Sequence, residues 1–282
     1  MTEPRVDAAG VLLAFYAEAG VDRAMGETAI DRLAAAEVVP APSVDAVPAD
    51  MPASRPALRL EQTRRDVAPP GAAPAAPEAA IMAARDAAKN AASLEVLRGI
   101  LEKFEGCALR VTAKQLVFAD GNPQARVMFV GEAPGREEDL EGLPFVGRSG
   151  KLLDRMLAAI GLNRTTAYIA NIVPWRPPGN RTPTPQESQI CLPFVRRQIE
   201  LADPDLLVCL GGPAAAALLG VKEGIKRTRG RWFTYQTGRR EIRATATFHP
   251  AYLLRSPLEK RLAWRDFLAI KKALDVTLSS AR

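Results

Sequence analysis

The chain has 282 residues, of which 48% are hydrophobic, so it has enough apolar material for one or two domains with a sizeable core. Its formal net charge of +6 is uneven, because residues 221–282 hold 15 Lys and Arg against 5 Asp and Glu, a net charge of +10. This composition predicts a globular protein and excludes a fibrous one. A basic C-terminal region favours an anionic partner, nucleic acid before a membrane surface, although a solvated helical face would carry the same charge.

Targeting signals and disulfides are not indicated. No stretch approaches the ~20 apolar residues that span a bilayer, and residues 1–10 lack the basic and then apolar order of a secretory signal. Three cysteines, Cys107, Cys191 and Cys209, are odd in number and far apart, so they suggest no disulfide framework. We therefore expect a cytoplasmic protein with no membrane association.

The N-terminal third of the chain divides into segments of different composition. Residues 1–36 carry apolar clusters among alanines, which predicts a helical segment. Residues 37–80 are rich in Pro and Ala without periodicity, and we expect a disordered linker because they bury too little apolar area. A domain of residues 81–282 follows, and helical spacing over residues 82–103 predicts a helix at its start.

Short β-type runs alternate with helical patterns in the rest of this domain. The β-type runs are residues 127–130, 168–173, 206–210 and 240–247. The helical patterns are residues 151–160, 186–201, 213–219 and 257–277. This alternation predicts an α/β domain in which helices cover both faces of a mainly parallel sheet.

Three loops follow predicted strands and should meet at one sheet edge, where α/β proteins bind ligands. They read GEAPGREEDLEGLPFVGRSG from Gly131, NIVPWRPPGNRTPTP from Asn171 and FHPAYLLRSP from Phe248. Gly131 and Gly135 let backbone N–H groups approach a ligand, although a plain turn explains them equally well. Neither a phosphate loop nor a dinucleotide fingerprint is present.

One side chain in each loop suits recognition of a planar ring. Phe145 lies outside any periodic apolar stripe, so it either stacks on a ring or anchors the core. Asn171 offers a donor and an acceptor together, which reads the edge of a base or else caps a turn. His249 is the only histidine, which excludes a multi-histidine metal site and leaves it to face a ligand or cap a helix.

Together the three loop sequences resemble the family 4 uracil-DNA glycosylases of the uracil-DNA glycosylase superfamily, over residues 103–274. The resemblance implies a three-layer α/β/α fold with a central, mainly parallel four-stranded sheet. It implies a monofunctional glycosylase of base excision repair, which hydrolyses the N-glycosidic bond of deoxyuridine, releases uracil and leaves an abasic site. The implied partner is uracil-containing DNA. Separately from the resemblance, we expect a monomer in which residues 1–36 would be the site for any protein partner.

The resemblance also implies a role for individual residues. Phe145 would stack on the extruded uracil, Asn171 would bond its edge and reject cytosine, and His249 would donate toward uracil O2. The uracil-binding residues implied are Gly131, Ala133, Phe145 and Asn171. The candidates to position the water and to offset the cationic sugar are Glu132, Glu138 and Asp139. The residues expected against the DNA backbone, or in the gap left by the base, are Arg255, Ser256, Pro257 and Arg229.

The sequence departs from the family at its metal centre. Family members hold a [4Fe-4S] cluster with four cysteines, and such a cluster needs four thiolates. Cys107 and Cys191 match two of these positions, but Phe104 and Trp175 stand at the other two. We expect no cofactor, with the two aromatic rings packed as an apolar cluster and the two cysteines as buried free thiols, unless a ligand from elsewhere completes a cluster.

Two other functions remain open from the sequence. A uracil-binding or DNA-binding protein that has kept the pocket and lost turnover would share these loops, and release of uracil from an oligonucleotide separates it from an enzyme. A protein-interaction module would place its function in residues 1–36, and deletion of residues 1–80 tests that hypothesis.

Overall fold

The computed structural model describes residues 77–280, with side chains from residue 78 to residue 276. The predicted helical segment, residues 1–36, lies outside the described residues, and so does the predicted linker as far as residue 76. Within the described part of the chain no helix has the length and apolar character needed to cross a membrane.

A six-stranded sheet lies at the centre, in the order β1-β3-β2-β4-β6-β5. Its four inner strands are mutually parallel: β3 (Tyr168–Asn171), β2 (Val127–Gly131), β4 (Leu206–Leu210) and β6 (Glu241–Thr247). The predicted parallel sheet is therefore confirmed in these four strands. Two antiparallel edge strands were not expected, β1 (Asp120–Gly121) and β5 (Trp232–Gln236). They lack the buried apolar run that marks an inner strand, since β1 has two residues and most of β5 is partly exposed or exposed.

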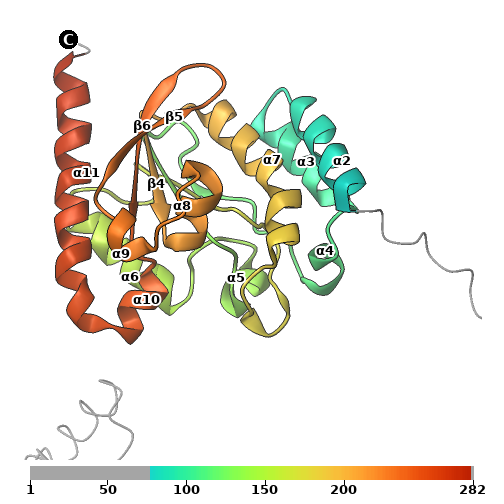
Figure 1. The fold of residues 1–282 in the computed structure, drawn as a ribbon, viewed down its shortest axis with the longest axis horizontal. Helices are drawn as coiled ribbons and strands as arrows, with labels where there is room; N and C mark the ends of the chain where they lie inside the picture. The colour runs from blue at the N-terminus through green and yellow to red at the C-terminus, as the bar shows by residue number, and fades with distance from the viewer. Residues whose placement is uncertain (1–76, 281–282) are drawn as a thin grey trace, which may run out of the picture. The chain divides into compact units, whose positions relative to one another are not determined.

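Helices cover both faces of the sheet, as Figure 1 shows. One face carries α6 (Arg148–Ala158) and α11 (Lys260–Ser280). The other face carries α2 (Pro77–Lys89), α3 (Leu94–Lys103), α7 (Pro185–Ala202) and α8 (Gly212–Leu219). Strand β2 shows how alternation builds both layers, because Val127 and Phe129 belong to the α6 and α11 cluster while Met128 and Val130 belong to the α7 cluster. The three-layer α/β/α prediction is confirmed.

Short helices lie in the connecting loops: α4 (Leu109–Thr112), α5 (Arg136–Glu141), η1 (Pro178–Asn180), α9 (Ile225–Thr228), α10 (Pro250–Arg255) and η2 (Pro257–Glu259).

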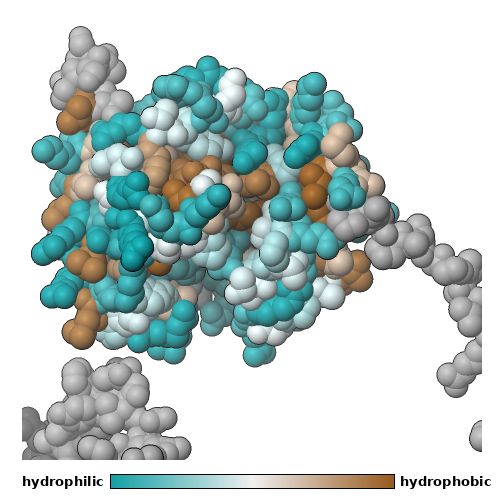
Figure 2. Space-filling model, in the orientation of Figure 1, coloured by the Kyte–Doolittle hydropathy of each residue, from teal (hydrophilic) through white to brown (hydrophobic). Residues whose placement is uncertain are grey.

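On the face drawn in Figure 2 hydrophilic residues predominate, and hydrophobic residues gather near the middle, over α8. Helix α8 reads GPAAAALL, so it has no polar side chain to place on its outer surface, which explains the hydrophobic area there.

The start of the domain differs from the prediction in two ways. Helix α2 begins at Pro77, four residues inside the predicted linker, because Ala80, Ala84 and Ala88 recur at helical spacing and are buried in the α7 cluster. The single helix predicted over residues 82–103 is two helices. Ser93 begins α3 as its N-cap, where its hydroxyl accepts from the N–H of Val96 at 3.3 Å.

Candidate active site

All four parallel strands end at one cavity of about 450 Å³, in the size range of small-ligand sites. The loops after β2, β3 and β6 converge there, as predicted. The predicted site residues that line the cavity are Glu132, Ala133, Glu138, Phe145, Asn171, His249 and Arg255. A carboxyl-edge position is where a parallel sheet exposes the ends of its strands together, so residues far apart in sequence meet here.

The floor of the cavity depends on Gly131. The parallel register of β2 and β3 places Gly131 directly beside Asn171. A Cβ atom at Gly131 would lie 2.5 Å from Oδ1 of Asn171 and 2.6 Å from Cζ of Phe145, so only glycine lets both side chains occupy their positions. Asn171 is 4% exposed, and its Oδ1 is buried without a hydrogen-bond partner. An unpaired buried acceptor at a cavity wall is a binding position for a donor on a ligand.

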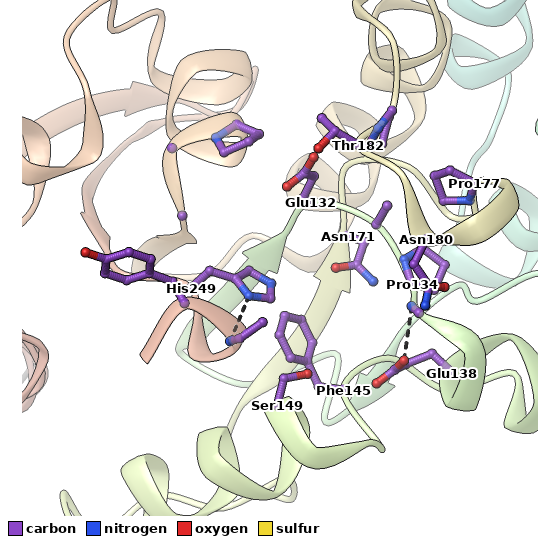
Figure 3. A pocket seen from close by; sticks show the side chains of 18 of the residues that line it. Glu132, Pro134, Glu138, Phe145, Ser149, Asn171, Pro177, Asn180, Thr182 and His249 are labelled. Carbon is purple, nitrogen blue, oxygen red and sulfur yellow. Dashed lines mark hydrogen bonds between the residues drawn. The ribbon is translucent and has the colours of Figure 1, made fainter. Parts of the chain in front are cut away.

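The rings of Phe145 and His249 pack together, tilted to one another, next to this acceptor. Their ring centroids are 5.4 Å apart and their planes differ by 32°. Figure 3 shows Phe145 between His249 and Asn171, while Glu132 reaches in from the end of β2 beside Thr182. An aromatic face next to a hydrogen-bonding edge suits a planar heterocycle.

The protonation state of His249 follows from its contacts. It is the N-cap of α10, and its Nδ1 accepts a hydrogen bond from the N–H of Ala251 at 3.1 Å. Burial lowers the pKa of His249 to about 4, the charge of Arg255 acts in the same direction, and Glu138 opposes both. At neutral pH the ring is therefore uncharged and its proton is on Nε2, which makes it a neutral donor. The helix-cap interpretation of His249 is confirmed, and the same residue also lines the cavity, so the two positions considered from the sequence do not exclude each other.

Glu132 presents an acceptor of a different kind. Its Oε1 is buried without a hydrogen-bond partner, and burial raises the pKa of its carboxyl group. A desolvated carboxylate with a free oxygen can hold a water molecule and stabilise nearby positive charge.

The other two acids do not present a free carboxylate. Glu138 lines the cavity, but its carboxylate accepts from the N–H groups of Gly135 at 3.0 Å, Val146 at 3.1 Å and Gly147 at 3.0 Å. It ties the two ends of the first loop together. Asp139 is 2% exposed, accepts from the N–H of Lys114 at 2.8 Å and does not line the cavity. Asp139 was one of three candidate acids, and the structure removes it from that set, because the turn of α5 directs its side chain toward the segment after α4.

The residues expected at DNA also divide. Arg255 is exposed at the rim of the cavity, Ser256 and Pro257 follow it, and the next side chain, Leu258, is 85% exposed. Arg229 instead has a side chain only 14% exposed that pairs with Asp266, with Nε 2.9 Å from Oδ2. Asp266 also accepts from the hydroxyl of Thr247 at 2.7 Å, so this pair fixes the end of β6. The prediction that Arg229 contacts DNA is wrong.

A fourth loop completes the cavity and was not predicted. Residues 211–213 follow β4 and line the cavity. Glycine suits position 211 for two reasons, since its φ is +97 and a Cβ there would lie 3.1 Å from Cβ of His249. The signal was present, since residues 206–210 were a predicted strand and its carboxyl end belongs to the same edge. Further lining residues were named in no predicted role: Ser149, Asn180, Thr182, Ile225 and Tyr252.

The donor set at the family's metal position does not fit a four-thiolate cluster. Cys107 and Cys191 are free, buried and 3.9 Å apart at their sulfur atoms. Trp175 is 2% exposed, and Phe104 packs edge-on against Phe194 with centroids 4.9 Å apart. Aromatic rings at two of the four ligand positions supply no thiolate, and among the described residues no group of three or more His, Cys, Asp or Glu is arranged to hold a metal.

The fold and the cavity define a class: three-layer α/β proteins that hold a planar, hydrogen-bonding ring at the carboxyl edge of a parallel sheet. Residues 118–268 match the model of the Uracil DNA glycosylase superfamily. The chain is 42% identical over 164 residues to the Type-4 uracil-DNA glycosylase of Thermotoga maritima, covering 58% of this chain and 84% of that protein. It is 41% identical over 168 residues to the Type-4 uracil-DNA glycosylase of Archaeoglobus fulgidus, with the same two coverages. The chain belongs to the uracil DNA glycosylase superfamily, within its type-4 family, and the resemblance seen in the three loops is confirmed.

Proposed function

We propose that this chain is a uracil-DNA glycosylase, which hydrolyses the N-glycosidic bond of deoxyuridine in DNA inside the cell and begins base excision repair. The observation that carries the proposal is the meeting of Glu132, Phe145, Asn171 and His249 in one cavity. The relatives named above bear this activity in their names, and they share most of their length with the chain.

Base recognition falls to Phe145 and Asn171. Uracil presents an N3–H donor beside its O4 acceptor, and the Asn171 amide offers Oδ1 to the donor and Nδ2 to the acceptor. Cytosine presents an acceptor and a donor in these places, so both contacts would be lost. A buried polar group left unpaired costs about 1–3 kcal/mol, which corresponds to roughly 5-fold to 150-fold discrimination. Phe145 stacks on the ring and holds its edge against the amide.

His249 and Glu132 carry the chemistry. As the bond between C1′ and N1 breaks, its electron pair moves onto uracil, and negative charge develops at O2. The neutral His249 ring donates its Nε2–H to that oxygen without having to lose a proton. Of the three candidate acids, Glu132 has the free buried oxygen, so it positions the water that adds to C1′ and stabilises the cationic sugar. The proton released by the water balances the uracil anion.

DNA contacts surround the cavity mouth. The reacting carbon is hidden in a duplex, so the nucleotide must be extruded before the chemistry. In this proposal Arg255, at the rim of the cavity, contacts a phosphate, and Leu258 fills the gap in the base stack. The exposure of both side chains supports these roles.

The proposal includes a monofunctional, cofactor-free monomer. Lyase chemistry at the abasic site needs an amine nucleophile, and the described residues that line the cavity include no lysine. Two thiols and two aromatic rings favour a protein without a cluster. We expect freshly purified protein to be colourless and to contain no stoichiometric iron, while it still releases uracil; a visible iron–sulfur absorption band would contradict this.

The test is release of free uracil from a uracil-containing oligonucleotide. We expect release by the wild-type protein, and a loss of at least about 100-fold in single-turnover rate for His249→Ala, the size found when one oxyanion donor is removed. Asn171→Ala should lose both rate and discrimination against cytosine. If wild-type protein binds the oligonucleotide but releases no uracil, it is a binding protein that has kept the pocket.

A further inference from the structure

The backbone of Phe145 is held in a conformation that a bulky residue rarely adopts. Its φ is +55, in the left-handed region, which costs a residue with a side chain of this size free energy that its surroundings must supply. Gly150 permits the conformation without enforcing it, since a side chain at Gly150 would overlap the carbonyl oxygen of Phe145. The ring of Phe145 is aimed at the cavity only while this backbone geometry persists.

Arg164 holds this geometry from outside the cavity. It lies in the turn between α6 and β3, and it does not line the cavity. Its Nη1 donates to the carbonyl of Pro144 at 3.1 Å, and its Nη2 donates to the carbonyl of Phe145. Two successive carbonyl groups therefore point at one guanidinium, and this fixes the peptide planes on both sides of the Phe145 Cα.

The guanidinium is itself oriented by two carboxylates. Nε lies 2.9 Å from Oδ1 of Asp154, on α6, and Nη1 also pairs with Asp120, on β1. The side chains of Arg164 and Asp120 are each 25% exposed, so the pair is largely shielded. The planar guanidinium group of Arg164 thus donates to two carboxylates and two carbonyl groups. The single ammonium group of a lysine could not reach all four acceptors.

We propose that Arg164 is a positioning residue for the glycosylase reaction: it clamps the Pro144 and Phe145 carbonyls so that the Phe145 ring presents its face to the uracil. This inference rests on the proposed function. Arg164 touches neither base nor sugar, and its effect passes through the backbone of Phe145.

The experiment compares Arg164→Met with Arg126→Met. Arg126 is a matched control because it also pairs with a carboxylate, Asp205 at 2.7 Å, and donates to a carbonyl, that of Leu274 at 3.1 Å. It does not line the cavity. We measure the single-turnover rate on a uracil oligonucleotide, the inhibition constant of free uracil and the melting temperature of each variant.

For Arg164→Met we expect the inhibition constant of uracil to rise roughly tenfold, the size expected when a base stack is weakened. The single-turnover rate should fall by a similar factor. Arg126→Met should lower the melting temperature, because an ion pair and a hydrogen bond are lost. It should change the inhibition constant and the single-turnover rate by less than about twofold, because the effects of distant substitutions on stability and on the site are independent. Uracil inhibition unchanged in Arg164→Met would overturn the inference.

A second measurement separates positioning from general damage. In a Phe145→Ala background Arg164→Met should cause less than about a twofold further loss, because the ring it positions is gone. Losses that multiply would overturn the inference. If Arg164→Met does not fold, Arg164→Lys replaces it, because it keeps a positive charge between the two carboxylates. A raised inhibition constant of uracil in Arg164→Lys supports the inference, and an unchanged one overturns it. Absence of release by wild-type protein would instead refute the proposed function.

Discussion

At the scale of single residues, the cavity is marked by polar atoms that the protein leaves unpaired. Among the described residues, two buried side-chain atoms lack a hydrogen-bond partner, Oε1 of Glu132 and Oδ1 of Asn171, and both belong to cavity-lining residues. Elsewhere buried polar groups such as Asp139 and Gln198 are bonded. Unpaired atoms cost stability in the free protein and are satisfied by a ligand and its water, so function and stability oppose each other here.

Replacement of Glu132 tests this opposition. Its pKa is raised in the folded protein, so its contribution to stability is present below about pH 4.5 and is lost as pH rises through the folded-state value. Glu132→Gln removes the buried charge and should raise the melting temperature at pH 7.5 by about 2–4 °C, for a gain on the order of 1 kcal/mol. The gain should disappear near pH 4, and the rate of uracil release should fall. Thermal unfolding at both pH values checks this, and an unstable but active variant would contradict it.

The state of His249 can be observed directly because the chain has one histidine. Its pKa of about 4 lies below the ordinary 6.5, so the ring should stay neutral from pH 5.5 to 8. Below about pH 6.5 the histidine of the unfolded chain takes up a proton while His249 of the folded protein does not. The free energy of unfolding therefore decreases as the pH falls below that value. We expect the ¹⁵N resonances of the untagged protein to show an unprotonated Nδ1 and a protonated Nε2. A titration midpoint near pH 6.5 would show that the buried, neutral donor is absent.

At the scale of elements, the parallel strands act as supports whose ends carry the site. Strands β2, β3, β4 and β6 are buried along most of their length. Lining residues follow β2, β4 and β6 directly, and β3 ends on one, Asn171. The end of α10 and the start of η2 extend this edge outward, with Arg255 of α10 at the rim and Leu258 of η2 exposed to solvent. An exposed leucine buries little apolar area and so contributes little to the stability of the free protein, which favours a role in contact with DNA.

Leu258→Ala separates extrusion from chemistry. On duplex DNA the single-turnover rate should fall at least about threefold, because filling the gap offsets unstacking that costs a few kcal/mol. On single-stranded DNA, which has no partner strand to leave, the rate should change by less than twofold. Leu268→Ala is the control, since Leu268 is also exposed, at 44%, but lies on α11 away from the cavity. Equal losses on both substrates would assign Leu258 another role.

At the scale of the whole molecule, the described domain contains every residue of the proposed site. Helix α2 is part of this domain although it supplies no residue of the site, since Ala80, Ala84 and Ala88 are buried in the cluster with α7. Arg197 of α7 also donates to the carbonyl of Ala91, just after α2, at 2.7 Å. The boundary of a functional fragment therefore lies before Pro77 and not at residue 80.

Two truncations check this boundary. Removal of residues 1–76 should leave the uracil-release rate within about twofold, because the described residues supply every side chain named in the proposed site. Removal of residues 1–91 should lower the melting temperature by several degrees, because α7 loses the helix that covers it. Lost activity in a folded 77–282 fragment would give the N-terminal residues a catalytic role.

The four parallel inner strands, the longer helices between them and three of the four loops followed from local sequence, because buried strands and the loops after them have short, contiguous signatures. The two edge strands did not, because they lack a buried apolar run. The parallel topology then placed Glu132, Phe145, Asn171 and His249 at one edge. The roles of Asp139 and Arg229 could not be obtained in this way. Their partners, Lys114 and Asp266, lie 25 and 37 residues away in the chain, and only packing brings them into contact. The clamp of Arg164 on Phe145 is of the same kind, since the φ of one residue is held by a side chain 19 positions later.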